Sequence, residues 1–144
     1  MQTSQNQLLA LERTVFEIGE EKKEDGIEDL RTETKTKRVK TVRETVKEYF
    51  ADIPVLIDVA YCESGIVQFN NDGTVLRGFI NPQDVGVMQI NEKYHLETSI
   101  RLGIDIYTLE GNLEYARFLY ETQGTRPWEY SSHCWNKKRE VALN

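Results

Sequence analysis

Apolar residues recur at three- and four-residue steps along much of the chain, which is the spacing of one face of an α-helix. The first such helix begins near Val39, and a second starts at Pro54, with Asp52 as its expected N-cap. The second helix runs toward Cys62, and the next position on its apolar side is Glu63. The apolar positions of the two helices are Val39, Val42, Val46, Tyr49 and Phe50, and then Val55, Leu56, Val59 and Ala60.

A different pattern follows between residues 67 and 91. Val67 and Phe69 precede an Asn-Asn-Asp-Gly turn, and Val75 and Leu76 come after it, which predicts two short strands. Residues 84–91 are expected to form a tight loop that leads back into helix. The sequence therefore predicts a small β-wing inserted between helices.

The remaining part of the chain is again helical in pattern. We expect a short helix from Glu97 to Leu102 and a longer one capped by Thr108 and ended by Gly124. Its apolar face consists of Leu109, Leu113, Ala116, Leu119 and Tyr120. An aromatic segment, residues 127–135, closes the fold, so residues 39–144 are predicted to form one mainly helical α+β domain.

The N-terminal part differs in composition. Residues 19–40 are dominated by charged residues and threonine, and such a stretch cannot bury enough apolar surface to offset its ordering entropy. We interpret residues 1–38 as a charged tail, either a tether or a solvated, fraying helix. A short apolar patch upstream could form one amphipathic helix; it comprises Leu8, Leu9, Leu11, Val15 and Phe16.

Composition narrows the classes of partner. The chain has 144 residues, 39% of them hydrophobic, which is enough for one domain and not for two. The net charge of -6 provides no basic field for a phosphate backbone, so we expect no nucleic-acid partner. No apolar run is long enough to cross a bilayer and no export signal is recognised. No cofactor is expected, and we predict a monomer.

Glu63 is the strongest catalytic candidate. The partial negative charge at the C-terminal end of a helix and apolar neighbours both disfavour an ionised carboxylate, so they raise its pKa. A carboxyl that stays protonated near neutral pH can protonate a glycosidic oxygen, which glycan cleavage requires. The alternative is a solvated glutamate at a helix end.

Three ordered motifs carry a resemblance to known enzymes. They are Cys62-Glu63-Ser64-Gly65, Gly86-Val87-Met88-Gln89-Ile90 and Gly111-Asn112-Leu113-x-Tyr115-Ala116. As a set, they resemble the motifs of soluble lytic transglycosylases and goose-type lysozymes. The Cys-Glu-Ser-Gly spelling, with Gln123-Gly124, Pro127-Trp128 and Cys134, is also similar to resuscitation-promoting factors, which are small muralytic domains of the same fold. The resemblance covers residues 49–135.

The resemblance implies a lysozyme-like fold that cleaves β-1,4 bonds in peptidoglycan glycan strands, with Glu63 as the catalytic acid. It also implies a Cys62–Cys134 disulfide. The expected substrate-binding residues are Ser64, Met88, Gln89, Asn91, Asn112, Tyr115 and Tyr130. Met88 could equally pack in the interior, and Asn112 and Tyr115 could be hydrogen-bonded core groups. The family's closing Ala-Tyr-Asn is not conserved here, and Tyr130 stands near its place.

A second carboxylate would bear on the type of reaction. Hydrolases use one as a nucleophile or as a base for water. Asp72 and Asp84 are the candidates, although turn chemistry alone accounts for either. Lytic transglycosylases need one acid/base group, because a hydroxyl of the substrate closes an anhydro ring. We expect this outcome, with a hydrolytic muramidase as the alternative.

Other chemistries fit the sequence less well. Cys62 with His95 or His133 could form a thiol nucleophile and base, but the surroundings typical of cysteine proteases are missing. The same residues with Cys134 lack the close spacing of zinc ligands, so no metal is expected. A non-catalytic peptidoglycan-binding or scaffold module is the alternative from another class. A wall substrate implies an extracytoplasmic protein whose export signal is absent from this chain.

Overall fold

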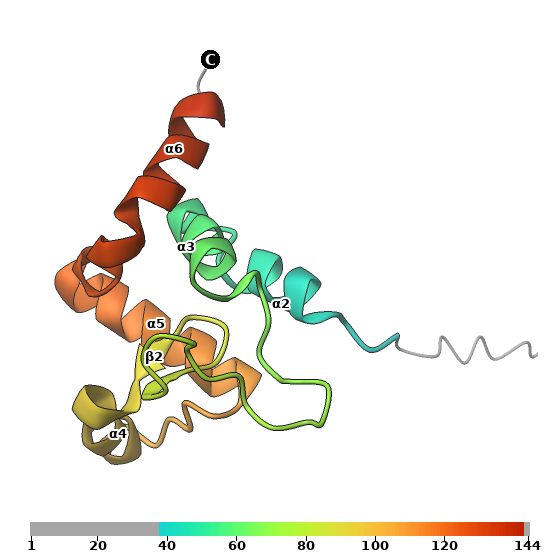
Figure 1. Cartoon of the computed structure of the whole chain (residues 1–144), viewed down its shortest axis with the longest axis vertical. Coiled ribbons are helices and arrows are strands. Elements are labelled where there is room, and N and C mark those ends of the chain that lie inside the picture. The colour runs from blue at the N-terminus through green and yellow to red at the C-terminus, as the bar shows by residue number, and fades with distance from the viewer. Residues whose placement is uncertain (1–37, 143–144) are drawn as a thin grey trace, which may run out of the picture. The chain divides into compact units, whose positions relative to one another are not determined.

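The computed structural model describes the backbone of residues 38–142 and the side chains of residues 38–137. The predicted tail up to residue 37, with its apolar patch, lies outside the described residues. The elements are the helices α2 (Val42–Tyr49), α3 (Pro54–Ser64), α4 (Glu92–Arg101), α5 (Leu109–Gln123) and α6 (Ser132–Ala142), the 3-10 helix η1 (Arg126–Ser131), and the strands β1 (Asp84–Val85) and β2 (Ile90–Asn91) (Figure 1). The predicted mainly helical α+β fold with a small antiparallel sheet is confirmed.

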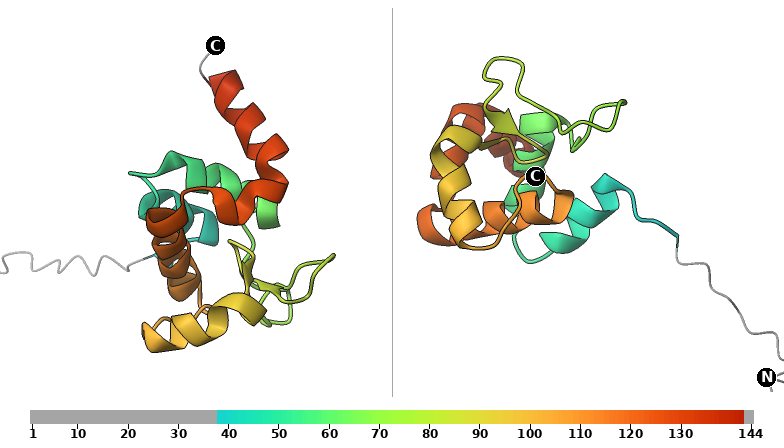
Figure 2. Two further views of the ribbon diagram at one scale, coloured as in Figure 1. Left: turned by 90° about the vertical axis from the view of Figure 1, so that its left-hand side faces the viewer. Right: turned by 90° about the horizontal axis from the view of Figure 1, so that it is seen from below.

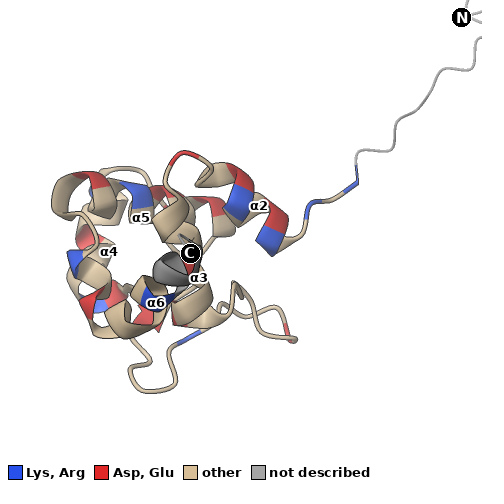
Figure 3. Cartoon of the chain, turned by 90° about the horizontal axis from the view of Figure 1, so that it is seen from above, with Lys and Arg blue, Asp and Glu red and all other residues tan. Residues whose placement is uncertain are grey.

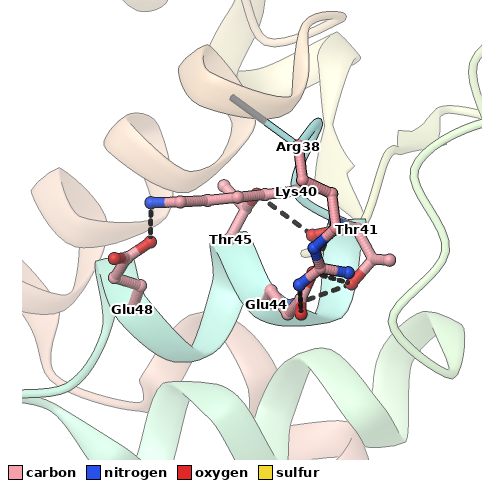
Figure 4. Close-up of polar contacts among 6 residues, drawn as sticks. All are labelled: Arg38, Lys40, Thr41, Glu44, Thr45 and Glu48. Carbon is pink, nitrogen blue, oxygen red and sulfur yellow. Dashed lines mark hydrogen bonds and ion pairs between the residues drawn. The ribbon is translucent and has the colours of Figure 1, made fainter. Parts of the chain in front are cut away.

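Helix α2 begins three residues after the predicted start, because a capping box fixes its first turn. The Thr41 hydroxyl accepts a hydrogen bond from the Glu44 backbone N–H, and the Glu44 carboxylate accepts one from the Thr41 N–H (Figure 4). These bonds, with Arg38, lower the pKa of Glu44 to about 2. Lys40 reaches Glu48 one turn further along the helix.

Helix α3 begins at Pro54, as predicted, but its N-cap is Ile53, and Asp52 does not cap it. Asp52 instead accepts two hydrogen bonds of 2.8 Å from the Arg117 guanidinium, which lowers its pKa to about 2. A charged partner on α5 competes successfully with a local cap, because the bidentate pair supplies two charge-assisted bonds. The predicted apolar face of α3 is buried, and it consists of Val55, Leu56, Val59 and Ala60.

Helix α5 has the predicted ends. The Thr108 hydroxyl accepts from the Gly111 N–H at 3.0 Å, and Gly124 caps the C-terminus. Its buried face packs in the same core as α3, together with Trp128 of η1 and Trp135 of α6. Glu63 therefore lies on a helix, α3, whose apolar face is packed in the core.

The β-wing is present, but its strands differ from the prediction. Phe69 and Val75 form only an isolated bridge, whereas the paired strands β1 and β2 lie in the segment that we expected to be a loop. A second bridge, between Arg77 and Val85, joins the two parts. In Figure 2 this long connection and α4 lie beside the helical body.

The C-terminal part is more regular than predicted. The aromatic segment spans most of η1 and the first turn of α6, and α6 leads away from the helical body toward the C-terminus (Figure 2). Helix α4 starts at Glu92, five residues before the predicted start. The Cys62–Cys134 disulfide is confirmed and joins α3 to α6.

Charges of both signs share the surface. Along α2, Arg43 and Lys47 alternate with Glu44 and Glu48, so this helix presents no uniform basic face (Figure 3). In the described part of the chain, no helix is long and apolar enough to cross a membrane.

Candidate active site

One pocket gathers the catalytic candidate and several of the predicted substrate residues. It has a volume of about 380 Å³ and lies between the β-wing, α4, α5 and η1, with the end of α3 in its wall. Five residues predicted from the sequence line it, namely Glu63, Asp84, Gln89, Asn91 and Tyr130. Asn81, Tyr94, His95 and Gln123 line it too. The sequence reasoning missed Asn81. It considered Tyr94 only as an aromatic face of the type that binds sugars, and it named His95 and Gln123 for other reasons.

Glu63 lies in the last turn of α3 and is partly buried. Burial is the main reason that its pKa is raised above the ordinary value, and the negative charge of Asp84 acts in the same direction. The Ser131 hydroxyl lies 2.6 Å from Glu63 Oε1 and opposes the shift. A carboxyl in this environment holds its proton more firmly than a solvated one, as a general acid requires.

The chain turns sharply directly after Glu63. Gly65 and Ile66 both adopt left-handed conformations, with φ of 68° and 65°. This conformation is rare for a β-branched residue such as Ile66, and it persists because the isoleucine side chain is buried. The Gly65 and Ile66 N–H groups donate to Tyr61 and Ala60 of α3, so the helix end that carries Glu63 is fixed.

Ser64 supports the site from the protein side. Its hydroxyl lies within hydrogen-bonding distance of the Val87 carbonyl, at 2.8 Å, and accepts from the Val67 N–H at 3.1 Å. It does not line the pocket. In place of the predicted substrate contact, Ser64 ties the end of α3 to the loop between β1 and β2.

Three further predicted substrate residues, Met88, Asn112 and Tyr115, are buried, so the structure corrects their assignment to the groove surface. Asn112 uses its amide to build the β1–β2 loop: Oδ1 accepts from the Met88 N–H, while Nδ2 donates to the carbonyls of Val85 and Ile106. Such full satisfaction explains how a polar side chain tolerates complete burial. Gly86 has φ of +73°, and a Cβ there would meet Asn112 Nδ2 at 2.5 Å.

The two candidate second carboxylates lie in different places. Asp84 lines the pocket, and its Oδ1 accepts from Asn91 Nδ2 at 2.6 Å and Asn81 Nδ2 at 3.2 Å. Asp72 lies in the exposed turn of the wing, where hydrogen bonds from Thr74 lower its pKa. Asp72 is outside the pocket, and the turn accounts for it, so only Asp84 remains as a partner for Glu63.

The loop between the strands brings Gln89 and Asn91 to the pocket. Gln89 adopts φ of 50°, and its Nε2 donates to the Gly86 carbonyl at 2.9 Å, which closes the turn on itself. Asn91 ends β2 and holds Asp84. The amide nitrogens of both residues therefore have structural partners, whereas the buried Asn91 Oδ1 has no hydrogen-bond partner among the described residues.

Aromatic residues border the pocket. Tyr130 is fully exposed and Tyr94 is 71% exposed, although both line the pocket. His95 is partly buried, burial lowers its pKa, and Nδ1 lies 3.2 Å from the Tyr115 hydroxyl. Exposed tyrosines beside a polar cleft offer both a stacking face and a hydroxyl, which suits a carbohydrate.

The described side chains contain no cluster of three or more His, Cys, Asp and Glu residues that could hold a metal ion. No protein-family model, curated protein or solved structure matches the chain.

Proposed function

We propose that the chain cleaves β-1,4 glycosidic bonds in the glycan strands of peptidoglycan, with Glu63 as general acid and then general base. The observation that carries the proposal is the environment of Glu63: a partly buried carboxyl of raised pKa in the wall of a polar pocket that exposed tyrosines border. The order of the sequence motifs around it supports the same chemistry and indicates the polymer.

In the proposed reaction, the protonated Glu63 gives its proton to the glycosidic oxygen as the bond to the anomeric carbon breaks. The Glu63 carboxylate then removes a proton from the group that attacks that carbon. A hydroxyl of the same sugar closes an anhydro ring and makes the protein a lytic transglycosylase, which is the outcome we favour.

A hydrolytic muramidase is the second candidate, and the position of Asp84 favours it. Asp84 shares the pocket with Glu63, and two amides hold one of its oxygens. A carboxylate in this place is suited to orient a water molecule or to stabilise positive charge on the sugar ring. A non-catalytic peptidoglycan-binding module is the candidate from another class.

We also propose an extracytoplasmic location, in the periplasm, in the cell wall or outside the cell. The Cys62–Cys134 disulfide supports it, because disulfides persist in oxidising compartments. The proposed substrate lies in the same compartments.

Glu63→Gln tests the function. Glutamine keeps the size of the side chain but has no proton to give, so the rate of glycan release from purified peptidoglycan should fall by at least about 10²–10⁴-fold. Binding to the polymer should persist. A folded Glu63→Gln protein with the wild-type rate would contradict the assignment, and a wild type that binds without turnover would favour the binding module.

Two aspartates provide the matched comparison. Asp84→Asn should lower the rate strongly if the enzyme is a hydrolase with a second carboxylate, whereas Asp72→Asn, outside the pocket, should leave it unchanged. Mass spectrometry of the products then separates the two reactions, because anhydro products are lighter by one water than reducing-end products.

A further inference from the structure

The Glu63 carboxyl has a hydrogen-bond partner from a distant part of the chain. Ser131 ends η1, 68 residues after Glu63, and its Oγ lies 2.6 Å from Glu63 Oε1. The same Oγ lies 3.1 Å from the Trp128 carbonyl oxygen. The distance to Glu63 is typical of a hydroxyl that donates to a carboxylate.

A serine hydroxyl has one hydrogen, so it donates to one of these two oxygens at a time. The Trp128 carbonyl also accepts from Trp135 Nε1 at 3.1 Å. It therefore keeps a partner when the Ser131 hydrogen points to Glu63. The Ser131 hydroxyl can serve the carboxyl without leaving a buried acceptor unsatisfied.

We propose that Ser131 is a positioning residue for the reaction: its hydroxyl donates to Glu63 Oε1, so that Oε2 is the oxygen that carries the proton to the substrate and takes one back. This inference rests on the proposed function. The proton on Oε2 moves to the glycosidic oxygen, which also keeps the electron pair of the broken bond. Oε2 then receives a proton from the attacking hydroxyl, while the Ser131 hydrogen stays on Ser131.

The surroundings hold Ser131 in place. Trp128 is buried, and its Nε1 donates to the Met88 carbonyl at 2.9 Å. Its backbone interrupts the helical geometry of η1, with φ of -112° and ψ of 24°. Cys134, three residues after Ser131, is bonded to Cys62, the neighbour of Glu63. The disulfide and the buried Trp128 thus hold the segment that carries Ser131 close to the helix end that carries Glu63.

Other groups face Glu63 from the surrounding elements. Asp84 of β1 acts on Glu63 by its charge, and Tyr94 and His95 of α4 and Tyr130 of η1 line the same pocket. Helix α5 contributes only Leu119 and Gln123 to the pocket. These groups are unchanged when Ser131 is replaced, so a comparison of variants isolates the hydroxyl.

The test is the pH dependence of kcat/KM on peptidoglycan for Ser131→Thr and Ser131→Val, which have the same shape and differ in the hydroxyl. Activity requires protonated Glu63 and falls above its pKa. Ser131→Val removes a donor that stabilises the carboxylate, so the pKa of Glu63 should rise. The alkaline limb should therefore move upward by about one pH unit, and kcat should fall roughly tenfold. Ser131→Thr should keep the wild-type limb. Ser132→Ala, at the neighbouring serine, should change neither quantity.

A second measurement does not depend on activity. The carboxyl 13C signal of Glu63, identified by its loss in Glu63→Gln, should titrate at higher pH in Ser131→Val than in Ser131→Thr. Equal titration and an unmoved alkaline limb would overturn the role of Ser131 and leave the proposed function standing. If the folded wild type releases no products while the Glu63 titrations of the two Ser131 variants differ, the proposed function alone is overturned.

Discussion

Glu63 is held in an environment that favours its neutral form, and this must affect stability as well as chemistry. Its pKa is raised in the folded protein, chiefly by burial, so the folded state binds more protons than the unfolded state between the ordinary pKa of glutamate, 4.5, and the raised value. Stability therefore falls as pH rises through this window. We predict that Glu63→Gln is more stable than the wild type at pH 8 and loses this advantage at pH 4. Urea unfolding at both values measures the difference.

Asp72 is the control with the opposite sign. Hydrogen bonds from Thr74 lower its pKa, so its stabilising effect is present above the unfolded pKa and is lost as pH falls through the folded one. Asp72→Asn should lower the stability at pH 8 and not at the lowest pH. If the stability of Glu63→Gln relative to the wild type changed with pH as that of Asp72→Asn does, burial would not be disfavouring the ionised carboxylate of Glu63.

Single residues differ in how far the sequence predicts them. The environment of Glu63, a partly buried carboxyl at a helix end, could be predicted because helix position and apolar neighbours are local features. Asn112 and Tyr115 lie in a motif but are buried, and the spacing of a motif does not distinguish a group that lines a groove from one that builds it. Ser131 carried no signal at all, because its contact with Glu63 depends on how η1 packs against α3.

At the scale of elements, the disulfide links α3 and α6 covalently. The Cys62–Cys134 bond closes a loop with a sequence separation of 72, which limits the freedom of the unfolded chain. We predict that reduction lowers the free energy of unfolding by about 2–4 kcal/mol. Urea unfolding with and without a non-thiol reductant measures it.

The double variant Cys62→Ser, Cys134→Ser serves as the control, since reductant should not change its unfolding. Two titratable thiols in the non-reduced wild type, with no effect of reductant, would contradict the prediction. Reduction should also lower activity, because η1 and its Ser131 are positioned through α6.

Elements with strong local signals were predicted, and elements that depend on tertiary contacts were not. Thr108 and Gly124 fixed the ends of α5, and Pro54 fixed the start of α3. Strands β1 and β2 were missed, because a strand of two residues is too short to show an alternation of apolar and polar positions. They depend on the turn made by Gly86 and Gln89 with positive φ. Helix α6 lacked a predicted start because aromatic residues dominate the segment before it.

For the whole molecule, the question is how much of the chain the proposed activity needs. Within the described part of the chain, the core and the pocket both consist of residues after Thr41, and Arg38–Asn144 form one compact unit. Among the described residues before Thr41, Arg38 and Lys40 form exposed ion pairs, which add little to stability.

We predict that a chain shortened to Arg38–Asn144 folds cooperatively and releases muropeptides at a rate within about twofold of the full chain, since all named motifs lie downstream. A chain beginning at Val42 also keeps the pocket but loses the Thr41 capping box, so its melting temperature should be lower by a few degrees. Circular dichroism and product release measure both, with Glu63→Gln in the shortened chain as the inactive control. A shortened protein that folds but does not cleave would show that the first 37 residues contribute to the site, and it would place the functional boundary upstream of Arg38.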